Sequence, residues 1–146
     1  MLRHTIHCEA VCESDPGTAA WASIIDDPRG YQQGLHGIQE QSSLHAAELT
    51  GVIEALRKTP VGARIKLLCA SRFIIDGLRE HIKTWERKGW KTAKGTPVAH
   101  ASLWMALREL ERQRQVQTQW VKDRRDHPGS LEAFEAAHKQ LQSVAA

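Results

Sequence analysis

The sequence has few cysteines and no long apolar run. Its three cysteines are Cys8, Cys12 and Cys69, and it contains no Cys-x-x-Cys pair. Three thiols cannot all pair with one another, so we expect free thiols in a reducing compartment. Residues 1–12 carry charges and histidines where a signal peptide would be apolar, and no stretch is long enough to cross a membrane. These absences predict a cytoplasmic protein with no membrane partner.

Internal repeats and low-complexity segments are also missing. The chain has 146 residues, of which 41% are hydrophobic and 25% charged. That composition is typical of an ordinary globular protein, and the length suits one domain with a proper core. We therefore predict a single domain over residues 1–146.

Charge is divided unequally along the chain. Residues 1–56 contain eight acidic and two basic side chains, whereas residues 57–146 contain nine acidic and 18 basic ones. A basic second part indicates a surface that binds a polyanion. The alternative is a dipolar surface with no ligand.

The basic side chains are densest over residues 84–97. This stretch holds Trp85 and Trp90 among lysines and an arginine, and its one acid is Glu86. Cations beside flat aromatic rings suit a phosphate backbone and its sugars. The alternative is a solvated loop that the two tryptophans anchor to the core. The candidate nucleic-acid-binding residues are Lys83, Arg87, Lys88, Trp90, Lys91 and Lys94.

Hydrophobic periodicity predicts a mixed α/β arrangement. Alternating patterns and turn residues predict three antiparallel strands over 5–11, 20–25 and 31–38. Helical spacing predicts helices over 43–58, from 71 onward, over 101–113, and over 130–141 with Ser130 as the cap. The apolar run over 64–70 suits a strand buried on both faces, and 116–121 predicts a fifth strand.

The chain resembles bacterial-type ribonuclease HI over nearly its whole length. The residues that carry the resemblance are Lys88-Gly89-Trp90-Lys91-Thr92-Ala93, Pro97-Val98, Leu103-Trp104, Ala47-Glu48-Leu49, Asp15-Pro16-Gly17, Trp120-Val121-Lys122 and His127-Pro128. The order of the predicted elements is similar as well. The resemblance implies an RNase H-like fold: a five-stranded mixed sheet with helices on both faces and a basic protrusion that helps to hold an RNA–DNA hybrid.

The resemblance also implies a site with many departures. Enzymes of that family place four carboxylates around two magnesium ions, which clamp the attacking and leaving oxygens of a phosphoryl transfer. The four positions here are Glu9, Glu48, Ala70 and Phe134, and Arg124 stands at the position of the family's loop histidine. Glu9 displaces its carboxylate by about 1.5 Å, against a tolerance of roughly 0.5 Å for a working site. Ala70 and Phe134 supply no ligand, and Arg124 cannot shuttle a proton.

We therefore expect no intact catalytic set, no metal and no cofactor. The favoured hypothesis is a catalytically degenerate protein that binds duplex nucleic acid, either an RNA–DNA hybrid or double-stranded RNA. One alternative is an active ribonuclease that uses Mg²⁺ or Mn²⁺ in a site rebuilt from Glu9, Glu48, Asp15 or Asp126. Another is a protein-interaction scaffold whose tryptophans pack against a partner protein or a second copy.

Overall fold

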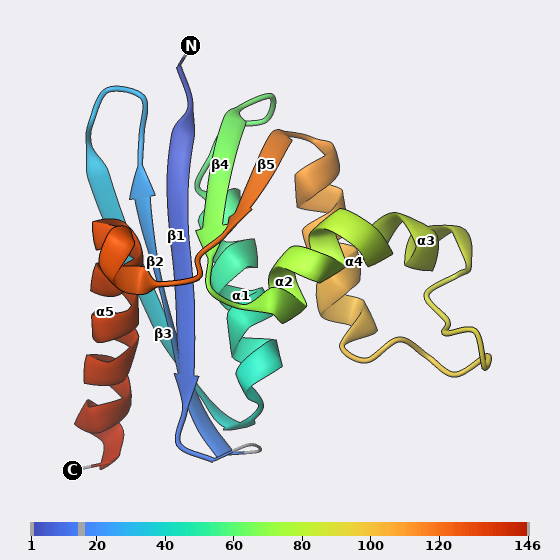
Figure 1. Ribbon diagram of the computed structural model, residues 1–146. Coiled ribbons are helices and arrows are strands. Elements are labelled where there is room, and N and C mark those ends of the chain that lie inside the picture. Colours follow the sequence, from blue (N-terminus) through green and yellow to red (C-terminus); the bar gives the residue numbers. More distant parts are fainter. Residues whose placement is uncertain (1, 15–16, 146) are drawn as a thin grey trace.

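A five-stranded mixed sheet forms the centre of the protein (Figure 1). The computed structural model describes residues 2–14 and 17–145. The strands are β1 (His4–Cys12), β2 (Gly17–Asp26), β3 (Gln32–Ser42), β4 (Arg64–Cys69) and β5 (Gln115–Trp120). Their order in the sheet is β3-β2-β1-β4-β5; the first three pair antiparallel, and β4 is parallel to both β1 and β5. The predicted mixed sheet is confirmed, and β4 lies in its interior.

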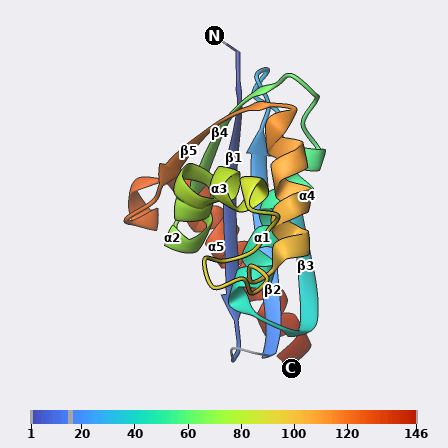
Figure 2. The same ribbon diagram turned by 90° about the vertical axis from the view of Figure 1, so that its right-hand side faces the viewer.

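Helices cover both faces of the sheet, as predicted (Figures 1 and 2). On one face α1 (Leu44–Arg57) packs on β1 and β2, and α4 (Ala101–Arg112) packs against α1. On the opposite face α5 (Pro128–Ala145) lies over β1, β2 and β3. The predicted start of the first helix is confirmed, because Ser43 caps α1 by accepting a hydrogen bond from the Ala46 N–H at 3.1 Å.

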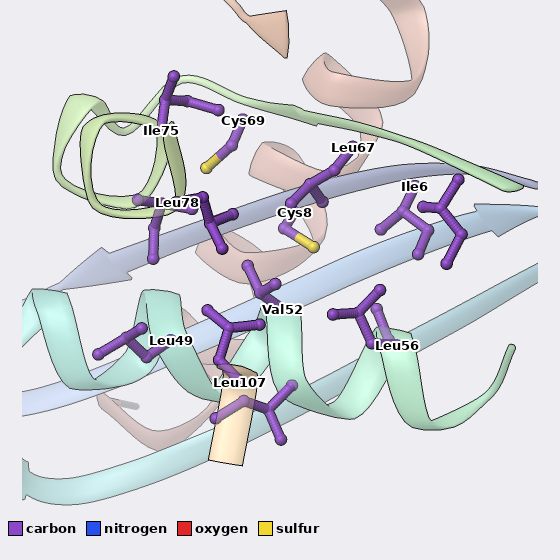
Figure 3. Packing of buried hydrophobic residues seen from close by; sticks show 14 of the residues in the cluster. Ile6, Cys8, Leu49, Val52, Leu56, Leu67, Cys69, Ile75, Leu78 and Leu107 are labelled. Atoms are coloured by element: carbon purple, nitrogen blue, oxygen red, sulfur yellow. The ribbon is translucent and has the colours of Figure 1, made fainter. Parts of the chain in front are cut away.

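The main core lies between the sheet and α1, with α4 closing one side (Figure 3). Its labelled members are Ile6, Cys8, Leu49, Val52, Leu56, Leu67, Cys69, Ile75, Leu78 and Leu107. Each large apolar side chain buried in this way contributes about 1.5–3 kcal/mol. Because side chains alternate along a strand, Ile6 and Cys8 facing α1 leave His7 and Glu9 on the α5 face. This alternation places the first candidate site residue.

A helical arm leaves the end of β4 and runs away from the sheet (Figure 1). It consists of α2 (Arg72–Asp76), a π-helical turn η1 (Gly77–His81), α3 (Ile82–Arg87) and the loop over residues 88–99 that leads toward α4. A side chain at Gly77 would place its Cβ 2.2 Å from the Trp104 ring. The glycine lets α4 approach the arm closely, and the wider π turn begins at this point.

The last helix begins earlier than the sequence indicated. It starts at Pro128, a residue that suits the first helical position because it lacks a backbone N–H. The prediction that Ser130 caps this helix is wrong. Ser130 is buried inside the first turn, and its Oγ lies 2.9 Å from His7 Nδ1 on β1.

Asp15 and Pro16 of the predicted turn lie outside the described residues. Its resemblance to the family turn is therefore an observation on sequence alone. Among the residues that the structure does describe, no helix has the length and apolar character to cross a membrane. The single-domain organisation stays a prediction.

Candidate functional site

Glu9 lies at the centre of the candidate site, on the face of β1 that α5 covers. Only 3% of its side chain is exposed, and its Oε1 accepts a hydrogen bond from Arg124 Nε at 2.9 Å. The guanidinium carbon of Arg124 lies 3.9 Å from the centre of the Phe134 ring. Arg124 comes from the short 3₁₀ turn η2 (Arg124–Asp126) and Phe134 from α5. The Glu9–Arg124–Phe134 cluster thus ties three elements together.

The electrostatics of the cluster depend on Arg124. Burial raises the pKa of the Glu9 carboxyl, whereas the positive charge of Arg124 and its hydrogen bond lower that pKa. The face of the Phe134 ring adds a favourable contact with the guanidinium, because the ring quadrupole attracts a cation. A carboxylate, a fixed cation and an aromatic ring therefore stabilise one another at this position.

Glu48 and Ala70 complete the set of predicted site positions. Glu48 lies on α1 and Cys69 ends β4. Burial raises the pKa of the Cys69 thiol well above its ordinary value, and the charges of Glu9 and Glu48 raise it further. Ala70 follows directly, and its carbonyl oxygen accepts a hydrogen bond from Trp120 Nε1 at 3.0 Å. The structure brings the positions together, but Ala70 offers only a methyl group.

This donor set does not fit a pair of magnesium ions, which require oxygen ligands in octahedral geometry. Within residues 2–14 and 17–145, no group of three or more His, Cys, Asp or Glu side chains could hold a metal ion. Glu9 Oε2 is buried without a hydrogen bond, yet the other oxygen of this carboxylate is bonded to a cation. Asp126, considered for a rebuilt site, is exposed on η2, and Asp15 lies outside the described residues.

The arm presents its cations to solvent. The side chains of Lys83, Arg87, Lys88, Lys91 and Lys94 are all exposed. Glu86, the one acid among residues 83–94, instead faces α4, where it pairs with Arg108 at 3.2 Å and with Arg112. Because this acid is held by α4, it does not neutralise the exposed cations.

The two tryptophans of the arm anchor it to the core. Trp85 is half-buried, and its ring centre lies 5.3 Å from that of Trp104 in an edge-on arrangement. Trp90 is also half-buried against the core; its backbone N–H donates to the Trp85 carbonyl at 2.7 Å, and its own carbonyl accepts from the Val98 N–H at 3.0 Å. Trp90, one of the candidate binding residues, therefore anchors the arm to the core.

Comparison with known proteins bears on both the fold and the site. The family model for RNase H matches residues 2–142. The chain belongs to the RNase H family. Ribonuclease H of Cupriavidus metallidurans is 31% identical to it over 144 residues, which are 99% of this chain and 99% of that one.

Solved RNase H structures share the architecture. LC9-RNase H1, a type 1 RNase H with the type 2 active-site motif, superposes with a TM-score of 0.82 at 18% identity, covering 95% of this chain and 72% of that one. LC11-RNase H1, solved in complex with an RNA/DNA hybrid, superposes with a TM-score of 0.69 at 14% identity, covering 95% and 99%. At these identities the likeness establishes the RNase H fold.

One feature of this RNase H-fold site was not anticipated from sequence. Arg124 was placed at the position of a loop histidine, but its ion pair with Glu9 was not predicted. A signal existed, because a carboxylate inside a buried strand requires a counter-charge. The partner is 115 residues away in the chain, so the sequence could not indicate which of its many arginines would supply that charge.

Proposed function

We propose that this RNase H family protein binds duplex nucleic acid, an RNA–DNA hybrid or double-stranded RNA, without cleaving it. The observation that carries the proposal is the Glu9–Arg124–Phe134 cluster. The ring of Phe134 stands at a position where the resemblance implies a carboxylate, and the guanidinium of Arg124 stands at the position of the loop histidine.

The chemistry of the cluster supports a loss of catalysis. Phosphoryl transfer by two metal ions needs several carboxylates that hold the ions and share their charge. Here Glu9 is engaged by Arg124, and the side chains of Ala70 and Phe134 cannot ligate a cation. Arg124 also cannot act as a proton shuttle, because an arginine side chain stays protonated.

The arm supports binding. The five exposed cations over residues 83–94 can each neutralise a phosphate, and Glu86, the one acid in that range, is turned toward α4. Both tryptophans fix the arm to the core, so little ordering of the backbone is needed on binding. LC11-RNase H1, with the same fold, was solved with a hybrid. An A-like duplex would be recognised through its groove width and 2′-hydroxyls rather than its base sequence.

The test measures binding and cleavage on the same duplexes. The protein should bind a hybrid at low salt and leave it uncut in Mg²⁺ or Mn²⁺. The Lys88→Glu/Lys91→Glu variant should bind more weakly, and the slope of log K against log salt should fall by about 0.9 for each phosphate that the variant no longer neutralises. A matched control, Lys58→Glu/Lys139→Glu, makes the same charge change at exposed positions outside the arm and should bind like the wild type.

The names of the relatives favour a second candidate function, an active ribonuclease H. Metal-dependent cleavage of the hybrid by the wild type would establish this function and reject the proposal. No binding to any duplex at low salt, or equal weakening by the control variant, would reject the role of the arm. The protein-interaction scaffold would then become the leading hypothesis.

A further inference from the structure

We propose that the Arg124 guanidinium binds a backbone phosphodiester of the duplex, so that a fixed side-chain cation takes the place of metal ions at this site. The inference rests on the proposed function and deepens it. It names a second contact, separate from the cations of the arm, and it makes binding independent of divalent metal.

The first support is the set of donors that Arg124 keeps available. An arginine carries five N–H donors. Only Nε–H is used in the cluster, in the bond to Glu9 Oε1 at 2.9 Å. The terminal nitrogens donate to no other residue in the described part of the chain, and 34% of the side chain is exposed. A partly exposed guanidinium whose terminal N–H groups have no protein acceptor is suited to a bidentate bond with a phosphate.

The second support is the rigidity of the guanidinium. Glu9 holds it on one side and the Phe134 ring lies 3.9 Å beneath it. Arginine loses much rotamer freedom when it binds a ligand, and here that freedom is already lost in the folded protein.

The third support is the position of Arg124 relative to the arm. Trp120, the last residue of β5, lies beneath the guanidinium of Arg72 on α2, at 4.7 Å from the ring centre. The segment that leads from β5 to η2 therefore begins beside the base of the arm. Lys122, also on this segment, is exposed. In the proposal, one duplex contacts both the arm and this segment.

The ion pair complicates a simple substitution, because replacing Arg124 alone leaves Glu9 buried without its counter-charge. The experiment therefore compares Glu9→Gln with Glu9→Gln/Arg124→Gln. Neither variant has a charged residue at position 9, and they differ only in the guanidinium. The control is Arg125→Gln, which removes the neighbouring arginine; that side chain is 83% exposed and paired with Asp123. Thermal unfolding verifies that each variant is folded.

Affinity for an RNA–DNA hybrid is measured in EDTA across a series of salt concentrations. The comparison is between the two glutamine variants: we expect Glu9→Gln/Arg124→Gln to bind about tenfold more weakly than Glu9→Gln, the effect of one good charge-assisted contact. Its salt slope should fall by about 0.9. Arg125→Gln should change affinity less than about twofold, since an exposed pair contributes little.

Three outcomes would overturn the inference. Equal affinity of Glu9→Gln and Glu9→Gln/Arg124→Gln would show that the guanidinium does not touch the duplex, while the proposed function would stand if the Lys88→Glu/Lys91→Glu variant still bound more weakly than the wild type. A requirement for Mg²⁺ in the binding assay would show that metal, not Arg124, holds the phosphate. Failure of the wild type to bind any duplex would reject the inference together with the proposed function.

Discussion

Replacing Arg124 with alanine should destabilise the protein, because Glu9 would lose its counter-charge. Removing one partner of a buried ion pair typically costs about 3–5 kcal/mol. Glu9 is 3% exposed but Arg124 is 34% exposed, so water can replace part of the missing interaction. We therefore expect a loss of about 2–3 kcal/mol in the free energy of unfolding. For a chain of this size the midpoint of thermal unfolding should fall by roughly 6–12 °C.

The measurement is urea unfolding at pH 7, followed by circular dichroism, for four proteins: wild type, Arg124→Ala, Glu9→Gln, and the double variant. Glutamine keeps the shape of Glu9 and removes its charge, so the double variant should recover most of the stability that Arg124→Ala loses. A loss below about 0.5 kcal/mol in Arg124→Ala, the size of an ordinary surface effect, would refute the reasoning. So would a double variant no more stable than Arg124→Ala.

The same pair predicts a pH dependence with a defined sign. The pKa of Glu9 is raised in the folded protein above its ordinary value of 4.5. Its contribution to stability is therefore fully present below pH 4.5 and is lost as the pH rises through the folded pKa. Without Arg124 the folded pKa moves higher, so the loss becomes larger at neutral pH. The stability difference between wild type and Arg124→Ala should shrink as the pH falls toward 4.5.

Three further predictions concern other parts of the molecule. The first variant restores the family's site residues through Glu9→Asp, Ala70→Asp, Arg124→His and Phe134→Asp. It should bind Mn²⁺ in a calorimetric titration, and a folded variant that does not bind would refute this prediction. Gly77→Ala should destabilise the protein by about 1–3 kcal/mol through overpacking, because the new Cβ would lie 2.2 Å from the Trp104 ring. In the same unfolding assay Gly34→Ala should change stability little, because its nearest contact would be at 3.7 Å. Burial lowers the pKa of His7 below 6.5, so stability should fall as the pH drops through 6.5, and a His7→Gln variant should show a flatter pH profile.

Most of the fold could be predicted from sequence, because its elements follow strong local patterns. The apolar run of β4 indicated a strand buried on both faces, and it lies between β1 and β5. Helical spacing indicated α1, and the sequence offered Ser42 or Ser43 as its cap, of which Ser43 caps the helix. The start of α5 was missed because Ser130 looked like a cap, whereas its hydroxyl pairs with His7, a residue 123 positions away. Such a long-range partner leaves no local trace in the sequence.

The candidate site was predictable only as a set of positions. The resemblance located Glu9, Glu48, Ala70 and Phe134, and strand alternation with helical spacing explains why they converge. The use of Arg124 as an internal cation depended on the path of the segment between β5 and α5. The sequence likewise did not show that Glu86, the one acid of the basic stretch, would pair with Arg108 on α4. Charge pairing between distant segments is a property of the tertiary structure.

The two buried thiols have a practical consequence. Cys8 and Cys69 stand opposite each other on the neighbouring strands β1 and β4, and burial raises the pKa of the Cys8 thiol to about 12. Neither sulfur is an effective nucleophile while these strands stay paired, because a thiol reacts as its thiolate. An alkylating reagent will therefore modify them only when the middle of the sheet opens. The rate at which Cys8 and Cys69 are alkylated therefore measures how often the middle of the sheet opens, and the measurement requires no added label.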